Sequence, residues 1–412
     1  MEKTMNLEKA KQKLDQYQQS HLLRYYDELN DAQKTALLEQ IDTTDFSVLA
    51  KIHAPKTEDT QSNITPIEAM TLDEIASQKK EMHNIGLDAI KAHKVGAVLL
   101  AGGMGTRLGS DHPKGMYDIG ITKPVYIFQR IIENLFDVVK EADTWIHLFI
   151  MTSDKNHEDT TSFFEKMNYF GYDKNYIHFF RQDMAPASDY NGKIFLEEKG
   201  KLATSPNGNG GWFSSLQNAG LIDLIHKEGI TWINVFAVDN VLQRIADPTF
   251  IGATIAKKCD CGSKVVRKAS PDEKVGVMCL ENGHPSIVEY YELTEAMRDA
   301  KNAKGEPAYN FGVILNYLFE IGHLEKIANN ELPLHIVEKK IPYLDEQGNL
   351  QKPEDVNGYK FESLILDLIR LFDNCLPFEV ERNKEFAPIK NKTGVDSIDS
   401  ARELLKGNGI TL

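Results

Sequence analysis

Apolar residues recur at intervals of three and four through residues 6–50, the spacing expected for the buried face of a helix. Residues 54–71 contain two prolines and many Ser, Thr, Asp and Asn residues, a composition typical of a loop. A further helix is predicted over residues 72–93. The pattern therefore predicts a helical N-terminal region over residues 1–93, and we expect it to act as a lid or brace for the rest of the chain.

The pattern changes at Val95, where short, continuous apolar runs replace the helical spacing. Such runs are typical of parallel strands that are buried on both faces. Segments with helical spacing separate them, and this alternation indicates a parallel sheet with right-handed crossovers. We expect strands at residues 95–101, 145–152, 176–180 and 230–240, and helices at residues 124–141, 159–168 and 211–228.

Beyond Ser263 the runs are separated by turn residues, which favours antiparallel strands. The last part of the chain predicts a helix over residues 359–372, a strand over 377–382 and a final helix over 397–406. We therefore expect three consecutive domains: the helical region over residues 1–93, an α/β catalytic domain over 94–346, and a small α+β C-terminal domain over 347–412.

Composition narrows the class of protein. The 412 residues exceed the size of one usual core, which at about 150 residues per domain also predicts two or three domains. The net charge of −14 disfavours binding to nucleic acid or to an anionic membrane surface. The N-terminus has no apolar secretory segment, and the four cysteines have no disulfide or zinc-site spacing. We expect a cytoplasmic protein with reduced thiols.

The segment from Leu99 to Gly115 carries the clearest chemical pattern. It leaves a predicted buried strand and contains five glycines together with Arg107 and Lys114. Glycine allows backbone N–H groups to converge on an anion without obstruction by a Cβ atom. The two long cations add charge, which a triphosphate requires. The segment therefore predicts a phosphate-binding loop.

Two familiar phosphate loops do not fit this segment. A Walker A loop needs a Lys directly after a Gly in the GxxxxGK[ST] frame, and the segment has none. In a dinucleotide fingerprint, GxGxxG, the third glycine would stand at Leu108, but it comes one position later. A Rossmann-type NAD(P) oxidoreductase is therefore disfavoured, although it is kept as a competing hypothesis.

The run GGMGTRLG at 102–109, followed by PKG at 113–115, resembles the nucleotide-binding loop of the eukaryotic-type UDP-sugar pyrophosphorylases. It is most similar to members that make UDP-N-acetylglucosamine. Further matches follow in the same order along the chain: PNGNGG at 206–211, VDN at 238–240, DCGSKVV at 260–266, VGV at 275–277, VEYYE at 288–292 and FAPIKN at 386–391. The resemblance implies a Rossmann-like nucleotidyltransferase core, a mixed and mostly parallel sheet flanked by helices.

The resemblance also implies a reaction. Members of the family convert UTP and a sugar 1-phosphate to a UDP-sugar and pyrophosphate, with Mg²⁺ or Mn²⁺ as the metal. For this chain the expected pair is N-acetylglucosamine 1-phosphate and UDP-N-acetylglucosamine, with UDP-glucose or UDP-N-acetylgalactosamine as alternatives. We expect a monomer or a weak homo-oligomer.

Residue roles follow from the matched motifs. Arg107, Lys114 and Lys390 are the expected catalytic cations, which hold the triphosphate and the charge that develops on the leaving group. Asp239 is the expected metal ligand, because a carboxylate at the end of a parallel strand lies where such sheets bind ligands. The expected nucleotide contacts are Gly102, Gly103, Gly105, Thr106, Gln182 and Gly208. The expected sugar contacts are Gly276, Glu289 and Asn310.

Three positions depart from the family pattern. Phe311 and Val313 stand where the family usually has a small residue and a second Asn, and Asn207 stands where an Asp is more usual. These departures concern the identity of the sugar more than the phosphate chemistry. A non-catalytic protein that binds UDP-sugars is the remaining alternative, and the joint presence of all three catalytic cations with the metal ligand argues against it.

Overall fold

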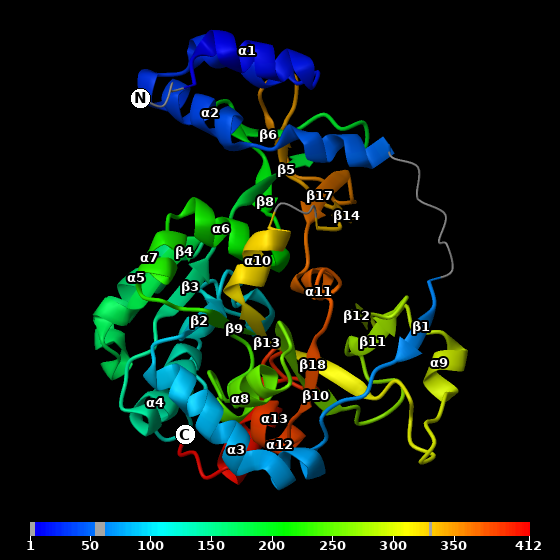
Figure 1. Cartoon of the computed structure of the whole chain (residues 1–412). Coiled ribbons are helices and arrows are strands. Elements are labelled where there is room, and N and C mark those ends of the chain that lie inside the picture. The colour runs from blue at the N-terminus through cyan, green and yellow to red at the C-terminus, as the bar shows by residue number, and fades with distance from the viewer. Residues whose placement is uncertain (1–4, 54–61, 329–331) are drawn as a thin grey trace. The chain divides into compact units, whose positions relative to one another are not determined.

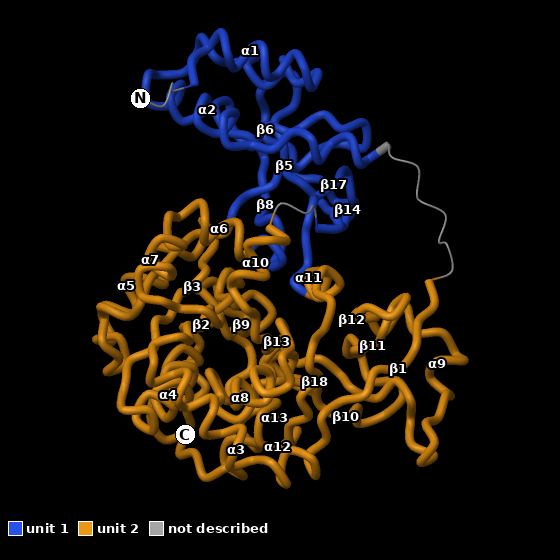
Figure 2. Tube along the Cα trace, in the orientation of Figure 1, with its two compact units in different colours: residues 1–60, 183–211, 332–365 blue, residues 61–182, 212–331, 366–412 orange. Residues whose placement is uncertain are grey.

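The computed structural model describes residues 5–53, 62–328 and 332–412. The chain forms two compact units, each assembled from three separate stretches (Figure 2). Unit 1 comprises residues 1–60, 183–211 and 332–365, and unit 2 comprises residues 61–182, 212–331 and 366–412. The units therefore cross the predicted domain boundaries after residues 93 and 346, because strands that are distant in the sequence pair within each unit.

A ten-stranded mixed sheet forms the centre of unit 2 (Figure 1). Its main path runs β1-β11-β13-β9-β2-β3-β4, with β12 paired to β11, β10 paired to β13, and β18 paired to β10. The strands are β1 (Ile64–Pro66), β2 (Val95–Leu100), β3 (Leu148–Thr152), β4 (Ile177–Arg181), β9 (Trp232–Ala237), β10 (Cys261–Arg267), β11 (Val277–Glu281), β12 (His284–Val288), β13 (Phe311–Glu320) and β18 (Leu376–Glu379).

Four neighbouring strands, β9, β2, β3 and β4, are mutually parallel. In this register Leu99 of β2 lies opposite both Ile150 of β3 and Phe236 of β9. All six residues of β2 are buried, as expected for a central parallel strand. The predicted mixed sheet with a mostly parallel core is confirmed. Antiparallel pairing predominates from β10 onwards, as predicted, although β10 pairs in parallel with β18.

Helices connect the strands of unit 2. They are α3 (Leu72–Lys91), α4 (Ile127–Ala142), α5 (His157–Lys166), α6 (Trp212–Asn218), α7 (Ile222–Lys227), α8 (Pro248–Ala256), α9 (Glu295–Asp299), α10 (Ile321–Ile327), α11 (Ile365–Ile369, which begins at the last residue of unit 1), α12 (Arg382–Glu385) and α13 (Ile398–Gly407). Gly86 and Gly252 allow α3 and α8 to pack backbone to backbone. A Cβ atom added at Gly86 would lie 1.8 Å from the Pro248 carbonyl oxygen, and one added at Gly252 would lie 1.7 Å from the Met82 carbonyl oxygen.

Unit 1 contains α1 (Leu7–Gln16) and α2 (Asp31–Thr43), which pack with residues of several strands around one core that includes Leu14, Ile41 and Phe361. Its largest sheet has the order β14-β17-β5-β8. The strands of unit 1 are β5 (Met184–Ser188), β6 (Leu196–Glu198), β7 (Lys201–Leu202), β8 (Thr204–Pro206), β14 (His335–Lys339), β15 (Tyr343–Leu344), β16 (Leu350–Gln351) and β17 (Gly358–Glu362).

Two local predictions are wrong. The helix predicted over residues 359–372 begins as a strand, because β17 pairs with β14 and β5, and only α11 within that range is α-helical. Within the loop predicted over 54–71, β1 pairs with β11, while residues 54–61 lie outside the described residues. Over the described ranges, the helices all lack the length and apolarity that crossing a bilayer would require.

Candidate active site

The glycine loop leaves the carboxyl end of β2 and folds back on itself. The Gly105 N–H donates to the His112 carbonyl at 2.8 Å, and the Lys114 N–H donates to the Gly103 carbonyl at 3.1 Å. Gly103 and Thr106 are exposed, and a Cβ atom added at Gly103 would have no neighbour within 4 Å. The predicted phosphate loop therefore has an open backbone face at the end of a parallel strand, where α/β sheets bind ligands.

The predicted nucleotide residue Gln182 lies directly beside this loop. A Cβ atom added at Gly102 would lie 3.1 Å from Gln182 Oε1, so glycine leaves room for the amide. Gln182 itself is buried, and its backbone N–H donates to the Thr152 carbonyl at 2.8 Å. Gln182 lies beside the glycine loop, although it is 80 residues beyond Gly102 in the sequence, because the pairing of β3 with β4 continues to this residue.

Lys114 is the centre of a cluster of charged side chains. Burial lowers the pKa of Lys114 below its ordinary value of 10.5, and Asp239, Arg107 and Lys390 lie close enough to alter it further. The carboxylate raises this pKa, and the two cations lower it. Three cations and one carboxylate, predicted as a group from motifs up to 283 residues apart, thus lie together in unit 2. Such a cluster attracts a polyanion.

Asp239 is joined through its backbone to the residue that precedes Lys390. Asp239 follows β9, and its carbonyl accepts a hydrogen bond of 2.9 Å from the N–H of Ile389, the residue before Lys390. The Lys390 ammonium lies 3.1 Å from Asp396 Oδ2. Sequence reasoning assigned Lys390 a role but did not identify this acidic partner, which stands only six residues later in the sequence.

Asp239 fits a magnesium ion that is shared with substrate. In the described part of the chain, no cluster of three or more His, Cys, Asp and Glu side chains could hold a metal ion. Mg²⁺ commonly binds through one or two carboxylates together with substrate phosphates and water, so it needs no such cluster. The half-buried Asp239 carboxylate beside the cationic loop is suited to this mode of binding.

Two of the three predicted sugar residues lie together. Gly276 precedes β11 and Glu289 follows β12, the strand that pairs with it. A Cβ atom added at Gly276 would lie 3.6 Å from Glu289 Oε2 and 3.5 Å from Val313 Cγ2. Val313, one of the departures from the family pattern, therefore borders the predicted sugar site directly.

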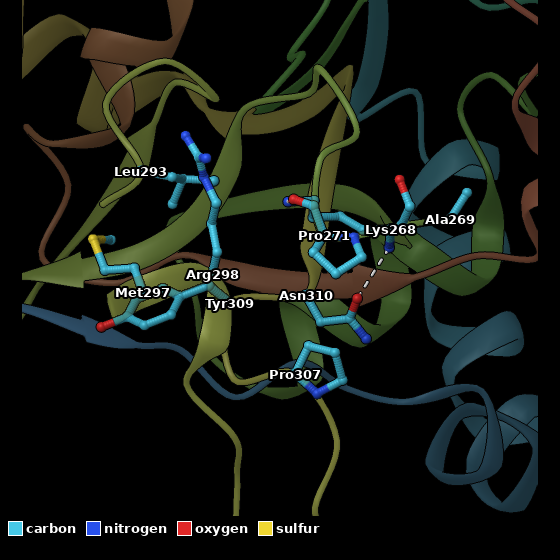
Figure 3. Close-up of a pocket in the computed structure, with 10 residues that line it drawn as sticks. Lys268, Ala269, Pro271, Leu293, Met297, Arg298, Pro307, Tyr309 and Asn310 are labelled. Atoms are coloured by element: carbon cyan, nitrogen blue, oxygen red, sulfur yellow. Dashed lines mark hydrogen bonds between the residues drawn. The ribbon is translucent and has the colours of Figure 1, made fainter. Parts of the chain in front are cut away.

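The third predicted sugar residue, Asn310, lies in a different local setting. It precedes β13, and its Oδ1 accepts a hydrogen bond of 3.1 Å from the Lys268 backbone N–H, drawn as a dashed line in Figure 3. Asn310 lines a cavity of about 150 Å³ together with Leu293, Met297 and Arg298. The described contacts therefore place Asn310 against β10 and this cavity, and its sugar role stays a prediction.

Gly208 belongs to unit 1, whereas the other predicted site residues belong to unit 2. It has a φ of +87°, and a Cβ atom added there would lie 2.1 Å from the Ser363 carbonyl oxygen. Ser363 also donates its N–H to the Asn207 carbonyl at 2.8 Å. The requirement for glycine at 208 is therefore explained by packing within unit 1, and its contact with a nucleotide stays a prediction.

Asn156 was not identified from the sequence. It is fully buried, its Nδ2 donates to the Ala101 carbonyl at 2.9 Å, and its Oδ1 accepts from the Ser153 N–H at 2.8 Å. It thereby fixes the start of the glycine loop to the turn after β3. The sequence did carry a signal for Asn156, because it is a polar residue that comes shortly after a buried parallel strand. The carboxyl ends of such strands meet at one edge of the sheet, where ligands bind.

The model of the UTP–glucose-1-phosphate uridylyltransferase family matches residues 43–404. The chain belongs to this family. It is 35% identical to human UDP-N-acetylhexosamine pyrophosphorylase-like protein 1, over 93% of this chain and 80% of the relative. It is 37% identical to the UDP-N-acetylglucosamine pyrophosphorylase of Saccharomyces cerevisiae, over 83% of this chain and 74% of the relative.

A solved structure supports the same placement within the uridylyltransferase family. The UDP-N-acetylglucosamine pyrophosphorylase of Trypanosoma brucei, crystallised with an inhibitor, superimposes with a TM-score of 0.79 at 27% identity, over 96% of this chain and 83% of that one. The chain is therefore a nucleotidyltransferase of the UDP-sugar pyrophosphorylase type. The resemblance first noted in the glycine loop extends over most of the chain.

Proposed function

We propose that the protein transfers the uridylyl group of UTP to N-acetylglucosamine 1-phosphate, which yields UDP-N-acetylglucosamine and pyrophosphate. The observation that carries the proposal is the cluster of Arg107, Lys390 and the Asp239 carboxylate around Lys114. A triphosphate and a sugar phosphate repel each other, so they react only where several positive groups offset their charge.

The reaction needs no nucleophile from the protein. A phosphate oxygen of the sugar phosphate attacks the α-phosphorus of UTP, the bond to the α–β bridging oxygen breaks, and pyrophosphate leaves with the bonding electrons. Arg107 and Lys114 bind the triphosphate, and Lys390 meets the charge that develops as the bond breaks. Asp239 would hold Mg²⁺, which when bound would supply further charge neutralisation on the phosphate oxygens. Alignment of the attacking oxygen with the leaving group contributes the rest.

Two relatives, the UDP-N-acetylglucosamine pyrophosphorylases of yeast and of a trypanosome, support N-acetylglucosamine as the sugar. Glucose or N-acetylgalactosamine 1-phosphate is the alternative, because Phe311 and Val313 differ from the usual family residues and Val313 borders Gly276. The sugar hydroxyls require an acceptor, and the Glu289 carboxylate beside Gly276 is suited to that role.

The experiment is pyrophosphate release from UTP with Mg²⁺ and a panel of three sugar 1-phosphates: N-acetylglucosamine, N-acetylgalactosamine and glucose. We expect the highest kcat/KM with N-acetylglucosamine 1-phosphate. A higher value with either other sugar would replace the proposed substrate but keep the reaction. An entirely negative panel, with UDP-sugars still bound, would favour the non-catalytic alternative and refute the proposal.

A pair of lysine variants tests the site itself. Lys114→Met removes the central ammonium while keeping an unbranched side chain, and we expect kcat to fall by at least about 10²-fold. Lys123→Met makes the same change at an exposed lysine nine residues later, and we expect kcat to stay within twofold of wild type. Equal activity in both variants would remove Lys114 from the mechanism.

A further inference from the structure

Residues 385–389 pair with residues 239–241, although about 145 residues separate the two segments in the sequence. The Ile389 N–H donates to the Asp239 carbonyl at 2.9 Å, and the Val241 N–H donates to the Ala387 carbonyl at 3.3 Å. Between these bonds Asn240 and Pro388 form an isolated β-bridge. Residues 385–389 are therefore attached to the turn after β9, which contains the predicted metal ligand Asp239.

The Asn240 side chain adds two bonds to the same segment. Its amide Nδ2 donates to the Glu385 carbonyl at 2.7 Å, and its Oδ1 accepts from the Ala387 N–H at 2.9 Å. The side chain is only 1% exposed, so water cannot replace either bond. A side-chain amide suits both bonds, because a carboxylate has no donor, an apolar side chain has neither group, and a serine hydroxyl is too short to reach both partners.

Ion pairs anchor the beginning of this segment. The fully buried Lys264 Nζ lies 2.5 Å from Glu385 Oε2 and 3.1 Å from Asp247 Oδ2. Glu385 Oε2 also accepts a bond of 3.2 Å from the Arg244 N–H. With one end held by this buried charge cluster and the centre held by Asn240, the segment has little freedom before it reaches Lys390.

We propose that Asn240 is a positioning residue: its buried amide attaches residues 385–389 to the turn after β9 and so places the Lys390 side chain near Lys114. The inference rests on the proposed function, in which Lys390 meets the charge on the leaving group. Asn240 touches no substrate and acts only through Lys390. Asn240 of the VDN motif thus acquires a role that is separate from the metal ligand next to it.

The first test measures backbone amide hydrogen exchange and needs no substrate. In Asn240→Ala we expect the Ala387 and Ile389 amides to exchange at least about tenfold faster, while the amides of β2 keep their protection. Asn234→Ala is the matched control, because Asn234 is also 1% exposed and lies on β9, but its amide bonds to Asn316, Tyr317 and Ala246. We expect the control to leave the exchange of residues 387 and 389 unchanged.

The second test is a kinetic double-mutant cycle with Lys390→Ala. If Asn240 acts through Lys390, Asn240→Ala lowers kcat about tenfold or more in the wild-type background and has no further effect once Lys390 is absent. If Asn240→Ala lowered kcat only by damaging the structure, its fold-loss in kcat would multiply with that of Lys390→Ala. We expect this multiplicative result for any kcat loss in Asn234→Ala. If the alanine variant does not fold, Asn240→Ser is measured in its place, since its hydroxyl is too short to keep both bonds.

Unchanged exchange at residues 387 and 389 would overturn the proposal, and so would multiplicative effects in the cycle. These outcomes differ from a failure of the proposed function. A wild-type chain that releases no pyrophosphate with any sugar would refute that function, and the exchange measurement would still decide whether Asn240 holds the segment.

Discussion

The ion pair between Lys390 and Asp396 offers a direct test of how the site handles charge. The ammonium lies 3.1 Å from Asp396 Oδ2, so a phosphate that binds Lys390 as proposed would compete with this carboxylate. Asp396→Asn removes the competing charge. The substitution suits the backbone, because residue 396 has a φ of +52°, and asparagine tolerates the left-handed region. The Asp396 carbonyl can still accept bonds of 2.7 and 3.0 Å from the N–H groups of Lys390 and Asn391.

The expected magnitude follows from the exposure of the pair. The two side chains are 41% and 31% exposed, so water and salt screen the attraction, and such pairs are worth about 0.2–1 kcal/mol. If that energy no longer opposes the transfer of Lys390 to the phosphates, pyrophosphate should bind about 1.4- to 5-fold more tightly. The gain should shrink between 0.05 and about 0.5 M salt as the screening length falls.

The assay is inhibition of the forward reaction by pyrophosphate, measured for wild type and for Asp396→Asn at several salt concentrations. Asp399→Asn is the matched control, because Asp399 is 64% exposed and lies 3.9 Å from Arg402 rather than near Lys390. We expect the control to match wild type within error. Weaker pyrophosphate binding in Asp396→Asn would mean that Asp396 supports Lys390 in place, and the reasoning from competition would be refuted.

Three further predictions follow from burial and close packing. Lys114→Met should stabilise the unliganded protein at neutral pH, because burial penalises the ammonium. The gain in stability should shrink as the pH rises towards 10.5, where the unfolded-state lysine also loses its charge. Denaturant unfolding at several pH values measures this gain. Asp239→Asn should raise the Mg²⁺ concentration needed for half-maximal activity at least about tenfold, as a metal titration would show. Gly86→Ala should lower the free energy of unfolding by about 1–3 kcal/mol, because its Cβ atom would meet the Pro248 carbonyl oxygen at 1.8 Å.

Each of these has a contrary outcome. A stability gain in Lys114→Met that does not change with pH would show that the charge of the lysine is not its source. An unchanged metal requirement would remove Asp239 from the metal site. For the glycine, Gly407→Ala is the control, because a Cβ atom there would have no neighbour within 4 Å, and we expect it to be neutral or slightly stabilising. Equal stability of the two glycine variants would contradict the close packing of α3 and α8.

Sequence reasoning was most successful where a local pattern has a local cause. The run at 95–101 predicted β2 because a central strand must be apolar on both faces, and all six of its residues are buried. Asp247 stands directly before Pro248, a local signal for the start of a helix, and its side chain accepts a bond from the Thr249 N–H at the start of α8. By contrast, residues 358–362 became a strand because their partners, β14 and β5, supply bonds that no local window contains.

By itself, the sequence determined the fold class, the family and the residues worth testing, because buried strands and phosphate-binding glycines depend on the composition of short segments. Only the tertiary structure decided which of those residues meet. Lys390 lies close enough to Lys114 to lower its pKa because the 385–389 segment pairs with 239–241, and Gln182 lies beside Gly102 because the β3–β4 pairing continues to Gln182. These side chains lie close together because of hydrogen bonds between distant segments. The free energy of those bonds is gained only when the whole sheet has formed.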